Sequence, residues 1–139
     1  MELSEFFAVH MAAGCDLQQI RDCVERVTGE TLKESFDESE GRHFETIFNK
    51  QYFTVIKEFV SLTFDDEAGI PFSRLPVMVS FEPYGTPPGA EERQELCREI
   101  ALRVAKAIFE ELHYDCVVSK SMQERLATFK SPENDWIGG

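Results

Sequence analysis

The chain has 139 residues, with 26 acidic and 14 basic side chains and a formal net charge of −12. A charge this far from zero keeps a small domain soluble and repels polyanions, so we expect neither nucleic acid nor an anionic membrane surface as a partner. No run approaches the roughly 20 apolar residues of a membrane span. The first residues are acidic where a secretory signal is basic, so the sequence predicts a cytoplasmic protein.

Length and composition predict a single domain over residues 1–139. Hydrophobic residues make up 42% of the chain and include 12 Phe, enough for a normal core. The cysteines have no C-x-x-C pair and no spacing typical of zinc or disulfide frameworks. They are Cys15, Cys23, Cys97 and Cys116. We therefore expect free thiols, no metal and no cofactor.

The N-terminal part predicts two short helices. Apolar residues at helical spacing, from Leu3 to Met11, indicate a helix over 2–12. Asp16 resembles an N-cap, with Gln19 at the capping-box position, and Gly29 stands where a helix-ending glycine should.

The middle of the chain predicts an acidic loop and then a β region. Residues 30–45 contain six acids, and 37–41 look like a solvated turn. Alternation around Phe44 indicates a strand, with a hairpin turn at 49–50. Residues 52–64 are long for one strand, and the apolar positions change parity, from Phe53 and Val55 to Val60, Leu62 and Phe64. This change predicts a bulge or bend near Lys57-Glu58. Residues 76–83 read as a third strand with alternate apolar positions.

The C-terminal part predicts a long helix at about residues 90–112, with a broad apolar stripe. A buried strand over 114–119 follows, then a short helix at 121–129. A strand–helix–strand run usually closes as a crossover with parallel strands. The sequence thus predicts an α+β fold: an antiparallel β-meander extended by one crossover strand, packed against the long helix, with two short N-terminal helices.

No catalytic residue is predicted. We expect His10 to be packed in the core or an interface, and His113 to cap the long helix. A dyad of Cys116 with His113 or His43 is formally possible but has no orienting third residue. A divalent cation at residues 65–67 lacks the spacing of a dedicated loop, so no metal ligands are predicted.

The acidic clusters suggest docking to a basic protein, since complementary charge raises association rate and specificity. Aromatic residues at turns, loops or the tail would supply the central anchors. The predicted partner-binding residues are Asp37, Glu38, Glu40, Asp65, Asp66 and Glu67, with Tyr52, Tyr84 and Trp136 as anchors.

The resulting functional hypothesis is a small acidic bacterial binding protein, monomeric or weakly dimeric. Its most concrete form is an immunity protein that neutralises a cognate toxin by occluding a basic active-site cleft. One alternative is an acidic secretion chaperone, which should dimerise and hold an extended effector before export. A second alternative is a small enzyme with an unrecognised Cys/His or carboxylate site.

Overall fold

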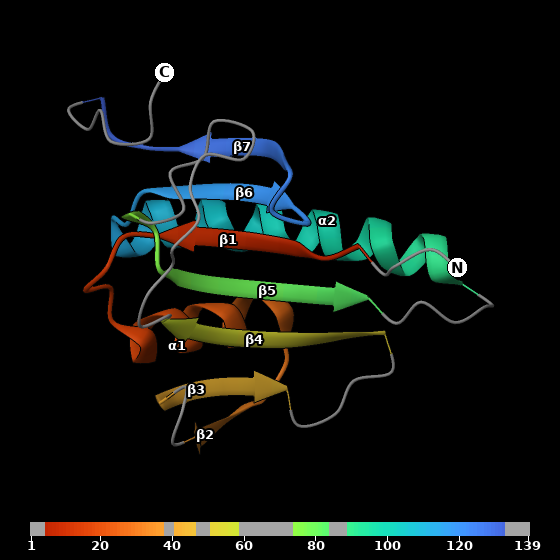
Figure 1. Cartoon of the computed structure of the whole chain (residues 1–139), viewed down its shortest axis with the longest axis horizontal. Helices are drawn as coiled ribbons and strands as arrows, with labels where there is room; N and C mark the ends of the chain where they lie inside the picture. Colours follow the sequence, from red (N-terminus) through yellow and green to blue (C-terminus); the bar gives the residue numbers. More distant parts are fainter. Residues whose placement is uncertain (1–4, 38–40, 47–50, 59–73, 84–88, 133–139) are drawn as a thin grey trace.

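The computed structural model describes residues 5–37, 41–46, 51–58, 74–83 and 89–132. Its strands form one antiparallel sheet of seven, in the spatial order β2-β3-β4-β5-β1-β6-β7. The helices lie against one face of this sheet (Figure 1). In chain order the elements are β1 Phe7–Met11, α1 Leu17–Thr28, β2 Leu32–Asp37, β3 Gly41–Thr46, β4 Tyr52–Glu58, β5 Val77–Pro83, α2 Ala90–Ala107 continued by a π-helical segment Ile108–Leu112, β6 Cys116–Lys120 and β7 Glu124–Phe129. The predicted α+β class is confirmed.

The first segment is a strand, which corrects the predicted helix over 2–12. β1 pairs with β5 on one side and β6 on the other, with Val9 opposite both Val79 and Val118. All five of its residues are buried. A strand buried on both faces has no alternation of buried and exposed positions, so its largely apolar run imitates a helical stripe.

Two further strands were missed. β2, in an acidic stretch for which no strand is predicted, pairs with β3 from Leu32 opposite Thr46 to Asp37 opposite Gly41. β7, predicted as a short helix over 121–129, pairs with β6 through a register shift after Val118. Both are at the edges of the described sheet, and each carries charged residues, which natural edge strands use and which interrupt the apolar pattern of a strand.

The long helix and the strand after it are confirmed, but their topology differs from a simple crossover. β5 and β6 run parallel to each other, because both are antiparallel to β1. β1 lies between them, so they are not neighbours. The predicted meander of three strands is present as β3-β4-β5.

Strand β4 uses the opposite parity from the one predicted. Tyr52, Thr54 and Ile56 are buried, whereas Phe53 and Val55 are half-buried. Its ladder with β5 is regular through Glu58 opposite Val77, so the irregularity predicted near Lys57-Glu58 is not present within Tyr52–Glu58. Residues 59–64 of the predicted strand and the turn at 49–50 lie outside the described residues.

Local signals located α1 correctly. Asp16 Oδ1 accepts from the backbone N–H groups of Gln18 and Gln19, at 2.9 and 3.3 Å, and Gly29 ends the helix in the left-handed region at φ 76°. The capping box itself is not formed. The Asp16 N–H donates to the Tyr114 hydroxyl instead, and that hydroxyl donates to the Gln19 side chain.

The main core lies between the sheet and the two helices. α2 contributes five buried residues, and β5 contributes Val77, Val79 and Phe81, as predicted. The buried α2 residues are Cys97, Ile100, Ala101, Val104 and Ala105. On the opposite face of β1, His10 is 1% exposed and its Nε2 lies 2.7 Å from the Ser119 hydroxyl. The prediction that His10 is a packed residue is confirmed, on a strand rather than a helix.

Candidate functional site

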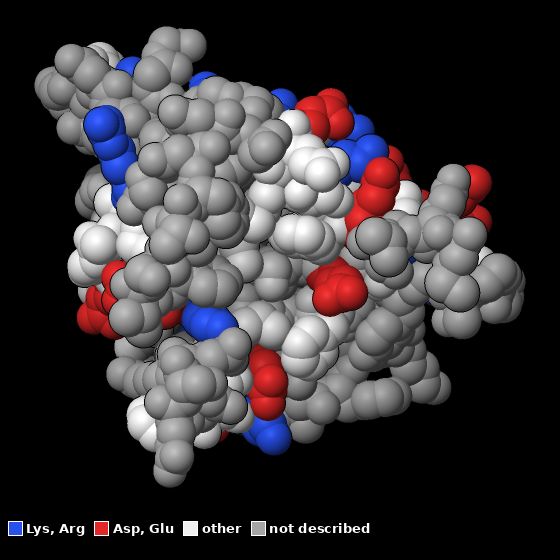
Figure 2. Space-filling model, viewed as in Figure 1, with Lys and Arg blue, Asp and Glu red and all other residues white. Residues whose placement is uncertain are grey.

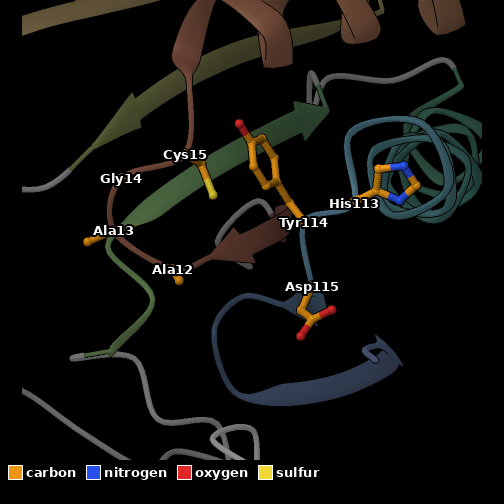
Figure 3. A pocket seen from close by; sticks show the side chains of 7 residues that line it. All are labelled: Ala12, Ala13, Gly14, Cys15, His113, Tyr114 and Asp115. Carbon is orange, nitrogen blue, oxygen red and sulfur yellow. The ribbon is translucent and has the colours of Figure 1, made fainter. Parts of the chain in front are cut away.

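A cavity of about 250 Å³ opens where the connection from β1 to α1 meets the connection from α2 to β6. Figure 3 shows the residues that line it. They are Ala12, Ala13, Gly14, Cys15, His113, Tyr114 and Asp115. Sequence reasoning did not single out this group, because its two halves are about 100 residues apart in the chain and only the fold brings them together.

Turn geometry and two polar contacts build this cavity. Gly14 and His113 both have left-handed backbone, at φ 89° and 60°, and His113 ends the π-helical segment as the predicted cap. The Gly14 N–H donates to the Glu58 carboxylate at 3.3 Å. Asp115 is buried and accepts from the backbone N–H of Ser131 at 3.0 Å. These contacts tie β1, β4 and the residues after β7 to one place.

Cys15 is the only thiol in this cavity, and its surroundings disfavour the thiolate. Burial, helped by the Glu58 carboxylate, raises the pKa of Cys15 to about 11. The neutral thiol is a poor nucleophile at physiological pH. In Figure 3 the Tyr114 ring stands between Cys15 and His113, and the Asp115 carboxylate points in another direction. The three groups do not converge as a nucleophile, base and orienting residue would.

The dyad considered for Cys116 is not assembled. Cys116 is fully buried in β6, where its thiol lies 3.3 Å from the Tyr114 carbonyl oxygen. Burial raises the pKa of this thiol far above its ordinary value. His43 lies on β3, four strands away from β6, which is about 19 Å at the usual strand spacing. His113 is exposed at the end of the π-helical segment.

Within the described ranges, no group of three or more His, Cys, Asp or Glu side chains is arranged to hold a metal ion. The acidic turn at residues 65–67 lies outside those ranges. Helices of the described part are also too short or too polar to cross a membrane.

The predicted partner-binding residues fall into three groups. Asp37 is the last residue of β2. The prediction that Tyr52 lies at an accessible turn is wrong: Tyr52 is 3% exposed at the start of β4. Its ring packs edge-on against the Phe81 ring, with 6.2 Å between the ring centroids. The others lie outside the described residues: Glu38, Glu40, Asp65, Asp66, Glu67, Tyr84 and Trp136.

The strand register shows which strand ends lie together at one end of the sheet. Met11 pairs with Val77, His43 with Lys57, and Cys116 with Phe129. β1, β2, β4 and β7 therefore finish, and β3, β5 and β6 begin, at the same end of the sheet. We call this the Glu58 end; it is on the left in Figure 1 and contains the cavity described above.

Three stretches of sequence continue from described residues at the Glu58 end. Residues 38–40 follow Asp37, residues 59–73 follow Glu58, and residues 133–139 follow the segment that Asp115 binds after β7. Together these stretches contain seven acidic side chains and no Lys or Arg. Much of the excess negative charge of the chain thus belongs to stretches of sequence that continue from this end of the sheet.

The described framework itself is much less acidic. It carries 18 acidic and 13 basic side chains, against eight and one in the remaining residues. Figure 2 shows the sheet face opposite the helices, where described acids lie at several separate places among Lys and Arg side chains. Ion pairs such as Arg26 with Glu111 also neutralise charge between the helices.

Comparison of the sequence with protein-family models and with curated proteins finds no match to either. The functional argument therefore depends on the chain's own residues.

Proposed function

We propose that this chain is an acidic binding protein that docks on a basic protein through the Glu58 end of its sheet. In its most concrete form it is an immunity protein, which neutralises a bacterial toxin by occluding the basic active-site cleft. The observation that carries this proposal is the attachment of three acid-bearing, Lys- and Arg-free stretches to one end of the sheet.

Concentrated charge affects association more than dispersed charge does. At physiological ionic strength, exposed charges are screened beyond about 8 Å, so only acids close to the contact attract the partner strongly. Acids close to the contact steer a basic cleft toward it and raise the association rate. A cleft that binds phosphate groups offers the matching positive field.

Identification of the bound protein tests the proposal. The tagged chain is expressed with its untagged neighbouring genes, purified at low salt, and its partners are identified by mass spectrometry. We expect a folded basic protein whose toxic activity is lost in the complex. A dimer of this chain holding an extended effector would instead support the secretion chaperone, and a catalytic turnover by the chain alone would overturn the binding role.

Charge reversal tests the docking end. Reversing Asp37, Glu38 and Glu40 together, or Asp65, Asp66 and Glu67 together, should slow association and weaken its dependence on salt. The matched control reverses Glu91, Glu92 and Glu95, which are exposed near the start of α2 at the opposite end of the molecule (Figure 1). Equal association rates for all three variants and the unchanged protein would show that the acidity does not steer binding.

A further inference from the structure

Strand β2 forms an outer edge of the sheet: among the described strands its only neighbour is β3. An edge strand directs alternate backbone N–H and C=O groups away from the sheet, where they can pair with another chain. Natural proteins usually block such an edge with charged side chains, Pro, a bulge or a covering element.

One hydrogen bond fixes which residues of β2 point outward. The Leu32 N–H donates to the Glu25 carboxylate at 2.8 Å, so it is not paired with Thr46 across the ladder. In an antiparallel ladder, residues alternate between pairing inward and pointing outward. Leu32, Glu34 and Phe36 therefore direct their backbone groups outward, while Lys33 and Ser35 pair with β3. Glu25 already occupies the Leu32 position.

Phe36 adds an apolar side chain to this edge. It is 74% exposed, the one exposed large hydrophobic residue of the described chain. Leu32 is on the same face as Phe36 and is buried in the core, as is Phe44 opposite Glu34, so the cover of α1 ends before Phe36. An outward-pointing backbone and an accessible aromatic ring thus coincide at one residue. That residue is next to Asp37, at the Glu58 end.

The charge of the residues around β2 indicates which kind of segment binds at this edge. Residues 30–45 carry six acids against Lys33 and Arg42, and Glu34 shares the face of Phe36. Two copies of this chain meeting at β2 would bring these acidic segments together, which disfavours a dimer. A basic extended segment would meet opposite charge, and an apolar residue in it would cover the Phe36 ring.

We propose that the β2 edge, centred on Phe36, binds an extended basic segment of the partner as an added strand. Backbone hydrogen bonds at Phe36 hold the segment, an apolar side chain packs on the ring, and a Lys or Arg side chain two positions away, on the same face of the added strand, meets Glu34. This deepens the proposed function, on which it rests for the basic character of the partner.

Two acetylated hexapeptides test this edge, Thr-Lys-Thr-Val-Thr-Lys and Thr-Glu-Thr-Val-Thr-Glu, in which the charged residues and the valine project from the same face of an extended strand. Their binding to the full chain is measured by NMR hydrogen exchange and by titration. We expect the lysine peptide to slow exchange of the Phe36 N–H at least fivefold and leave β7 amides unchanged. The glutamate peptide should bind at least tenfold more weakly.

Variants at Phe36 separate the ring from the backbone. Phe36→Tyr should keep the affinity for the lysine peptide, Phe36→Ala should reduce it several-fold, and Phe36→Pro should reduce it further by removing the outward N–H. The inward ladder to β3 keeps its donors in all three, and unchanged thermal midpoints verify the fold. Equal affinity of Phe36→Pro and Phe36→Ala, protection at β7 instead, or concentration-dependent protection of Phe36 without peptide would each overturn the proposal.

The same variants distinguish this inference from the proposed function. If Phe36→Pro binds the purified basic partner normally while the charge reversals at 37–40 or 65–67 weaken binding, the edge is not the docking strand and the proposed function stands. If no basic partner is found at all, the proposed function fails, whereas the peptide experiment still decides whether the edge accepts a basic strand.

Discussion

Lowering the pH from 7 to 4 should destabilise the fold through one buried side chain, His10. Its ordinary pKa is 6.5, and burial lowers the pKa of His10 to about 4 in the folded protein. Between these values the unfolded chain binds a proton at His10 and the folded chain does not. The free energy of unfolding therefore falls as the pH drops below 6.5.

The two pKa values set the size of the effect. The cost from His10 is near zero at pH 7, grows to about 2 kcal/mol at pH 5 and reaches about 3 kcal/mol at pH 4. Protonation of carboxylates contributes over the same range, so a difference between variants is needed to isolate His10.

His10→Gln supplies that difference. An amide in place of the ring nitrogen can still reach the Ser119 hydroxyl, which lies 2.7 Å from His10 Nε2, but it does not titrate. Urea unfolding of both proteins at pH 7, 5 and 4 should show the unchanged protein losing about 3 kcal/mol more than the variant. Ser119→Ala, which keeps His10, should lose about 1 kcal/mol at neutral pH and retain the steeper pH dependence. Parallel curves for His10→Gln and the unchanged protein would refute the reasoning.

Three further outcomes follow from the core, the thiols and the helix cap. Ile100→Ala or Val104→Ala should each destabilise by about 1–4 kcal/mol, and unchanged denaturation midpoints for both would mean that the α2 stripe is not buried. Cys15 should react with iodoacetamide about 100-fold more slowly than an ordinary thiol, because burial raises its pKa to about 11. Cys15→Ser and Cys116→Ser should each leave partner binding intact. Rapid alkylation of Cys15, or lost activity in a folded variant, would support a nucleophilic role for the thiol. Asp16→Ala should cost about 1 kcal/mol in thermal unfolding by removing the α1 cap, and an unchanged midpoint would contradict the capping geometry.

Only some features of the candidate sites could be predicted from the sequence. Residue types alone predicted the acidic clusters around Asp37 and Asp65, because charge is a property of composition. They could not predict that these clusters attach at one end of the sheet, which depends on strand directions set by pairing. Nor could they reveal the Cys15 cavity or the outward backbone of Phe36, since each is formed by residues distant in the chain or by one particular register.

By itself, the sequence determined the elements whose signals are local. Asp16 and Gly29 delimit α1, an uninterrupted apolar stripe defines α2, and alternation marks β5, because caps and periodic faces act within a few turns of the chain. Only the tertiary structure decided the rest. β1 became a strand because insertion between β5 and β6 satisfies its backbone on both sides, and this long-range pairing outweighs the helical spacing of its apolar residues.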